Sequence, residues 1–171
     1  MVRRTARRLF CAVVIVMFGY LSGYSFASDE AKSVALSKAL SKVKLFAGLT
    51  DAERDALKAA ATLRRGKAGE RIIRQGQTLE RMFIILDSKV EVEVNGRHVV
   101  TFSGQPLVGE IEFLDGLPAA ADVLLGKDTD LIELNHAALT GLMKNHPRLG
   151  YVLMREIATM EAQRLRKTTQ K

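Results

Sequence analysis

Hydrophobic and polar positions follow a helical period at both ends of this chain and a strand period between them. Residues 28–44 carry apolar side chains from Val34 to Val43 at helical spacing, which predicts a helical, solvated spacer. Thr50 followed by Glu53 is the pattern of a capping box and predicts the start of a second helix. The apolar face of that helix comprises Ala52, Ala56, Leu57 and Ala60.

From about Ala61 the apolar residues occur in short runs of strand length. Val90, Val92 and Val94 alternate with glutamates, and Asn95-Gly96 follows as a strong hairpin turn signal. The other runs are Ile72-Ile73, Met82–Leu86, His98–Phe102, Val123–Leu125 and Leu131–Leu134. Short strands at close spacing with Gly and Asn turns predict an antiparallel roll rather than a parallel sheet.

The helical period then returns. Asn135 can cap a helix that His146-Pro147 ends, and a last helix carries an apolar stripe. This stripe comprises Leu149, Val152, Leu153, Ile157 and Met160. It either docks on the roll or pairs with the same helix of a second copy. The basic run Arg164–Lys171 is interpreted as a solvated helix end that complements the helix dipole.

The first 27 residues have the pattern of an export signal. Four arginines, at positions 3, 4, 7 and 8, precede the apolar run Leu9–Leu21, and Ser25-Phe26-Ala27 offers small residues at a cleavage site. Residues 1–27 are therefore predicted to be a signal peptide, which places the rest in the periplasm or otherwise outside the cytoplasm. The alternative is an uncleaved inner-membrane anchor with the domain outside, since about 20 residues span a bilayer. Cys11, the single cysteine, lies inside this segment.

Charge and length narrow the classes of function. The net charge of +7 includes the four N-terminal arginines, and the remaining 22 basic and 19 acidic residues leave only +3. This weakens a nucleic-acid interpretation. With 171 residues, of which 47% are hydrophobic, the chain fits one domain with a real core.

The stretch Lys44–Lys167 resembles the cyclic-nucleotide-binding domain of catabolite activator proteins, protein-kinase-A regulatory subunits and gated ion channels. Matching motifs occur in the family order: Leu45–Leu49 with Glu53, Gly69-Glu70 with Ile72, Gln75–Gln77, Phe83–Val94, and Val108–Pro118. The last of these resembles the start of the family's phosphate-binding cassette.

The resemblance implies a fold and a division of the chain. The fold is mainly β with flanking helices: an eight-stranded antiparallel β-roll, jelly-roll-like, with N- and C-terminal α-helices. The cyclic-nucleotide-binding-like domain is expected over residues 45–167, after the spacer 28–44 and before a basic tail at 168–171. Because the transcription-factor members carry a helix-turn-helix after the long helix, and none fits here, no nucleic-acid partner is expected.

The resemblance also implies a ligand site, with Gly109, Glu110, Ile111, Ala119, Ala120 and Ala121 as candidate residues. In the family, a glutamate accepts the ribose hydroxyl and an arginine after the proline grips the cyclic phosphate. Glu110 matches the glutamate, but Ala119 stands at the arginine position and Asp122 follows where the family has Thr or Ser. One lost charge-assisted hydrogen bond costs about 1.5–3 kcal/mol, and Asp122 is expected to add repulsion.

These features predict an exported, non-catalytic sensor or interaction module with weak or no cyclic-nucleotide binding. The alternative is a genuine receptor for a cyclic nucleotide or another anion at the cassette. His98, His136 and His146 have no metal-ligand spacing, so neither an enzyme, a metal nor a cofactor is predicted. Expected partners are a second copy, through the C-terminal helix, or another protein; a membrane partner follows only if the N-terminal segment is uncleaved.

Overall fold

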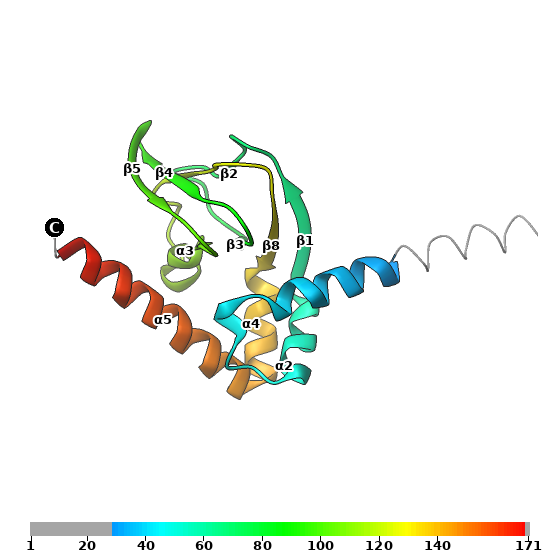
Figure 1. The fold of residues 1–171 in the computed structure, drawn as a ribbon. Coiled ribbons are helices and arrows are strands. Elements are labelled where there is room, and N and C mark those ends of the chain that lie inside the picture. The colour runs from blue at the N-terminus through cyan, green and yellow to red at the C-terminus, as the bar shows by residue number, and fades with distance from the viewer. Residues whose placement is uncertain (1–28, 170–171) are drawn as a thin grey trace, which may run out of the picture. The chain divides into compact units, whose positions relative to one another are not determined.

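Two antiparallel four-stranded sheets form the β-roll, which lies within the larger unit of the protein (Figure 1). The computed structural model describes residues 29–169, and the chain divides into the units Met1–Ala35 and Leu36–Lys171. The predicted signal peptide or anchor at 1–27 lies outside the described residues. Within residues 29–169, none of the helices combines the length and apolarity that a bilayer crossing needs.

The strands confirm the predicted eight-stranded antiparallel fold, which stays open rather than closing into a barrel. One sheet has the order β1-β8-β3-β6 and the other β2-β7-β4-β5. The strands are β1 (Ala61–Gly66), β2 (Arg71–Ile73), β3 (Arg81–Ile85), β4 (Val90–Val94), β5 (Arg97–Phe102), β6 (Leu107–Val108), β7 (Asp122–Leu125) and β8 (Thr129–Asn135).

The predicted hairpin turn between β4 and β5 is confirmed. Asn95 has a φ of 52° and Gly96 a φ of 71°, both in the left-handed region. Two consecutive positive φ angles define the tight turn that matches strand twist, and Asn-Gly adopts it at low cost. Val94 consequently pairs with Arg97 across the hairpin.

Helices gather mainly at one end of the roll, where α2, α4 and the first half of α5 lie together (Figure 1). Residues 29–41 are helical. The other helices are η1 (Lys44–Phe46), α2 (Asp51–Ala56), η2 (Leu57–Ala59), α3 (Glu110–Asp115), α4 (His136–Asn145) and α5 (Pro147–Thr169). The predicted break at His146-Pro147 thus separates α4 from α5.

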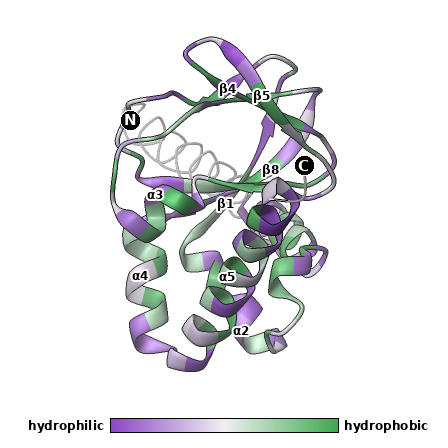
Figure 2. Ribbon diagram, turned by 90° about the vertical axis from the view of Figure 1, so that its left-hand side faces the viewer, coloured by the Kyte–Doolittle hydropathy of each residue, from purple (hydrophilic) through white to green (hydrophobic). Residues whose placement is uncertain are grey.

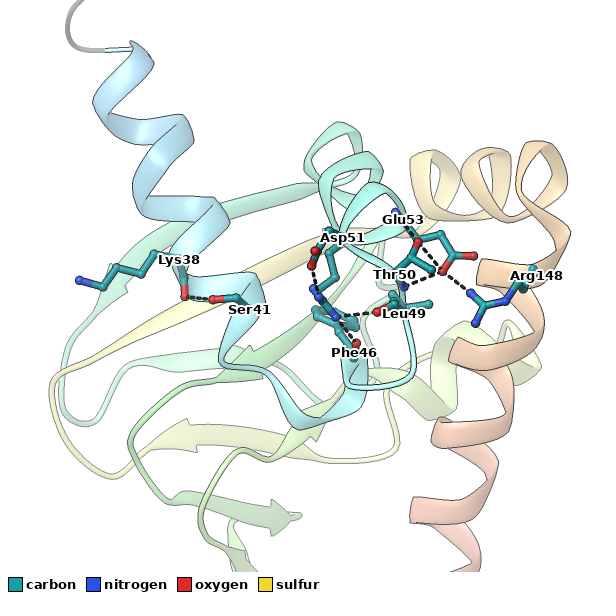
Figure 3. Close-up of polar contacts among 9 residues, drawn as sticks. Lys38, Ser41, Phe46, Leu49, Thr50, Asp51, Glu53 and Arg148 are labelled. Atoms are coloured by element: carbon teal, nitrogen blue, oxygen red, sulfur yellow. Dashed lines mark hydrogen bonds and ion pairs between the residues drawn. The ribbon is translucent and has the colours of Figure 1, made fainter.

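Both predicted N-caps are confirmed. The Thr50 hydroxyl accepts a hydrogen bond from Glu53 N at 3.2 Å, and the Glu53 carboxylate accepts one from Thr50 N at 2.8 Å. Asn135 caps α4 by accepting from Ala138 N at 2.9 Å. Arg148, at the start of α5, also donates to the Glu53 carboxylate, so the cap of α2 is tied to α5 (Figure 3).

The apolar stripe of α5 is buried inside its own chain. Leu149, Leu153 and Ile157 are fully buried in a core cluster with residues of η1, α4 and the first sheet. Hydrophobic positions on α4 and α5 recur along each helix at intervals of a turn (Figure 2). A second cluster, which includes Ile73, Phe83 and Leu131, fills the space between the sheets. Docking on the domain is therefore the role of the stripe.

The boundary of the domain differs from the predicted one. Leu40 and Val43 are buried in the core cluster beside Phe46, and the compact unit begins at Leu36. Burying one such side chain contributes about 1.5–3 kcal/mol. The second half of the predicted solvated spacer is therefore part of the domain.

Candidate functional site

A cavity of about 340 Å³ lies between the second sheet, α3 and the last turns of α5. Its walls are mostly apolar, and its charged groups are three glutamates and one arginine. We call it the roll cavity. It is lined by Ile73, Val92, Val100, Phe102, Val108, Gly109, Glu110, Ile111, Glu112, Ala120, Ala121, Val123, Glu161, Arg164, Leu165 and Thr168.

Gly109 sets the direction of α3 at the edge of this cavity. It has a φ of 82°, and a Cβ there would lie 3.2 Å from Arg81 O and 3.2 Å from Met82 Cα. Both the left-handed backbone and the close strand exclude a larger residue. The tight turn places Glu110 and Ile111 directly after β6, against the cavity.

Glu110 and Arg164 form a buried ion pair across the cavity. The Glu110 side chain is 3% exposed and that of Arg164 is 20% exposed. Arg164 Nη1 donates to the Glu110 carboxylate, and Nη2 donates to Leu107 O at 2.7 Å. Burial raises the pKa of Glu110 to about 7, while the Arg164 charge opposes that rise. The glutamate expected to meet a ribose is thus paired with the protein's own arginine.

Two further contacts fix the Arg164 guanidinium. Its Nη1 donates to Glu161 at 2.8 Å, one helical turn earlier on α5. Its Cζ lies 4.4 Å from the centroid of the Phe102 ring, in a cation–π arrangement. The interpretation of the run from Arg164 as a solvated helix end is therefore wrong at Arg164 itself, because tertiary partners from β5, β6 and α3 surround it.

The other predicted site residues lie close together but not all on the cavity. Gly109, Glu110, Ile111, Ala120 and Ala121 line it. Ala119 is 3% exposed, packs in the second core cluster, and falls outside the described set of lining residues. Its backbone bonds to the turn before β3, accepting from Gly76 N and donating to Gln77 O, each at 2.8 Å.

Asp122 has a structural role, and its predicted repulsion of a bound phosphate stays a prediction. Its carboxylate accepts a hydrogen bond from Gln75 N at 2.8 Å and lies 3.8 Å from Arg71 Nε. It is also outside the described lining of the roll cavity. The charge is thus used to join β7 to the turn after β2.

The Glu112 carboxylate binds the backbone amide of Ala120, shortly after the proline of the cassette. Its Oε1 accepts a hydrogen bond from Ala120 N at 3.2 Å, between α3 and the segment leading into β7. An incoming anion would have to displace this carboxylate to use the same amide. The chain therefore supplies its own acceptor at this point.

Sequence reasoning missed Arg164, Glu161, Glu112 and Phe102 as site residues. One signal for two of them was present: Glu161 and Arg164 follow Ile157 at i+4 and i+7, so they continue the buried face of α5. For Phe102, the alternation along the strand predicts only the face of the sheet on which the side chain lies. Its contact with Arg164 depends on where α5 crosses β5.

The histidines do not join this site. His98 contacts Thr101 at 2.9 Å in β5, and the His136 ring packs against Phe113 with ring centroids 5.0 Å apart and a tilt of 56° between the rings. Burial lowers the pKa of His136. Within residues 29–169, no three His, Cys, Asp or Glu side chains gather as a metal site would require.

Comparison with known proteins identifies relatives of this domain. Residues 63–146 match the family model described as "Cyclic nucleotide-binding domain". The Pycsar effector protein XpPycTIR of Xanthomonas perforans is 33% identical over 139 residues, which is 78% of this chain and 45% of that protein. The chain thus spans less than half the length of this curated relative.

Solved structures agree on the fold. A cyclic nucleotide-binding domain from Methylobacillus flagellatus KT superposes with a TM-score of 0.67 at 21% identity, covering 79% of each chain. The catabolite activator protein of Thermus thermophilus gives a TM-score of 0.60 at 25% identity, covering 73% of this chain and 59% of that one.

Proposed function

This chain belongs to the cyclic nucleotide-binding domain family, and we propose that it is a non-catalytic sensor module whose ligand site is the roll cavity. In this proposal cyclic nucleotides bind weakly or not at all. The alternative is a receptor in which a cyclic nucleotide displaces the internal contacts of the cavity.

The observation that carries the proposal is the Arg164–Glu110 pair. A cyclic phosphate needs a cation, but Ala119 stands at the family's arginine position and Arg164 is committed to two glutamates and a carbonyl. Loss of one charge-assisted bond, about 1.5–3 kcal/mol, lowers affinity by roughly one to two decades. The Glu112 carboxylate on Ala120 N adds competition at the same place.

A non-catalytic role agrees with the chemistry of the lining. Most of the wall is aliphatic or aromatic, and its charged groups stabilise one another in an ion-paired cluster. A sensor needs such a shaped, apolar-walled site more than a reactive group.

Calorimetry with cyclic AMP and cyclic GMP on the full chain tests the proposal. We expect no binding below millimolar concentrations for either nucleotide. A Kd in the micromolar range would contradict the proposal and favour the receptor alternative.

The variant Ala119→Arg is the matched gain-of-function test. It returns a cation to the family position in the sequence. Because the Ala119 methyl group packs in the second core cluster, the longer arginine side chain has to extend past this cluster to reach the roll cavity. If it does, we expect nucleotide affinity to rise about tenfold to hundredfold. Asp122 should stay unchanged in this variant because its carboxylate holds Gln75 N. A melting temperature close to that of the wild type confirms that the buried position accepts the larger side chain.

Export is a further part of the proposal, and it rests on the sequence of residues 1–27 alone. Basic residues followed by an apolar run direct the following domain across the membrane. A reporter enzyme that is active only outside the cytoplasm, fused after Lys171, should be active. Activity of a cytoplasm-only reporter at the same position would contradict export.

A further inference from the structure

The charges around the roll cavity do not balance. Among the described residues that line it, the carboxylates of Glu110, Glu112 and Glu161 face a single cationic side chain, Arg164. Arg164 Nη1 is shared between Glu110 and Glu161, and its contact with Glu161 is 2.8 Å. The excess is two negative charges when all three glutamates are ionised, and one when Glu110, whose pKa burial raises to about 7, is protonated.

Two of these carboxylates have acceptor capacity to spare. In the described part of the chain, Glu112 and Glu161 each accept a hydrogen bond through Oε1, from Ala120 N and from Arg164 Nη1. Glu161 also lies beside the Glu110 carboxyl, whose pKa it raises. Each ionised carboxylate can accept several hydrogen bonds. The Phe102 ring, which already attracts the Arg164 guanidinium, adds an aromatic face that favours positive charge.

We propose that the roll cavity selects a small organic cation with an apolar body, such as an arylalkylamine. This inference rests on the proposed function, because it takes the cavity to be the ligand site. The ammonium group hydrogen-bonds to Glu112 and Glu161 at the polar end, and the apolar body lies against wall residues such as Val92, Val100 and Val123.

The same features exclude anions. An anionic ligand meets a net negative lining, and the Ala120 amide that could hold it already donates to Glu112. Arg164 would have to leave a buried carboxylate to reach the ligand, and leaving a buried charge unpaired is costly.

A matched series of indoles tests the inference on the full chain. Tryptamine, tryptophol and indole-3-acetate share one ring and differ in charge, from positive through neutral to negative. The chain contains no tryptophan, so the indole fluorescence of each probe can be followed directly. We expect tryptamine to bind about tenfold more tightly than tryptophol, and indole-3-acetate to bind about tenfold more weakly than tryptophol.

Variants locate the effect. Glu112→Gln and Glu161→Gln should each weaken tryptamine binding about tenfold and leave tryptophol binding unchanged. Glu80→Gln is the control, since Glu80 is exposed and lies outside the described lining of the cavity. Equal loss of both probes would indicate a change of shape rather than of charge and would overturn the inference.

The outcomes separate this inference from the proposed function. Equal binding of the three indoles, a reversed order, or no binding of any of them overturns the selection for cations. The proposed function is judged by cyclic AMP in the same assay: a micromolar Kd contradicts it, whatever the indoles do. Tight tryptamine with weak cyclic AMP supports both.

Discussion

At the scale of single residues, the site depends on the ion pair between Glu110 and Arg164, which is largely shielded from solvent. Glu110 is almost completely buried, and Arg164 reaches it from a position 54 residues later in the chain. Burial raises the pKa of Glu110 to about 7, whereas the arginine favours its ionised form. Because of these two effects, the contribution of the pair to stability should depend on pH and on whether the Arg164 side chain is present.

Arg164→Ala should destabilise the protein more at pH 8 than at pH 5. At pH 8 Glu110 is mostly ionised, so the variant leaves a buried charge without a partner, at a cost of about 3 kcal/mol. At pH 5, below the folded-state pKa of about 7, Glu110 is protonated and the loss is smaller. Urea unfolding at the two pH values measures the difference.

Arg166→Ala is the matched control because it removes an exposed arginine from the same last turns of α5. Its effect should stay within about 0.5 kcal/mol at both pH values. An equal loss for Arg164→Ala at pH 5 and pH 8 would show that Glu110 does not carry the effect.

The sequence predicted that Gly109 and Glu110 both belong to the site because they lie in one motif. It could not predict the Arg164 contact, since that depends on where α5 crosses the roll. It also could not place Ala119, whose methyl group turns into the core rather than the cavity. Asp122 shows the same limit, because its backbone partner Gln75 lies 47 residues away.

At the scale of elements, period and capping signals located most helices and strands. The strand β6, Leu107–Val108, is too short to show a period, and only its pairing with β3 defines it. Residues 28–44 are predicted as a solvated spacer because serine, alanine and lysine are abundant in them. Burial of Leu40 and Val43 depends on core partners that local composition does not reveal.

Leu153→Ala tests the structural role of α5. Leu153 is fully buried in the first core cluster, so truncation should lower the free energy of unfolding by about 2–5 kcal/mol. Leu165→Ala, on the same helix but 68% exposed, should cost less than about 0.5 kcal/mol. Similar losses for the two variants in denaturant titrations would contradict the packing of α5 described above.

At the scale of the whole molecule, α5 has an exposed face in addition to its buried apolar stripe, and this face is free to contact a second copy. Tyr151 and Leu165 are 66% and 68% exposed. Exposed Ala158 and Ala162 lie between them, so the four residues follow one another at spacings of seven, four and three, which places them on one helix face. Small residues let two helices approach closely. We propose that a homodimer, if α5 mediates it, uses this face.

Sedimentation of the full chain tests this dimer. We expect wild-type protein to dimerise as its concentration rises and Ala162→Glu to remain monomeric, because the glutamate places like charges across the helix pair. Gln163→Glu, which adds the same charge at the next position, should leave the dimer intact. A wild-type monomer at every concentration would contradict the proposal.

The central claim, that Glu110 is buried and paired with Arg164 instead of a nucleotide, is tested by an NMR titration of the Glu110 side-chain carboxyl with and without millimolar cyclic AMP. We expect a midpoint of about 7, a higher midpoint in Arg164→Ala, and no change when the nucleotide is added. A midpoint near the ordinary value of 4.5, or a clear shift when cyclic AMP is added, would contradict it.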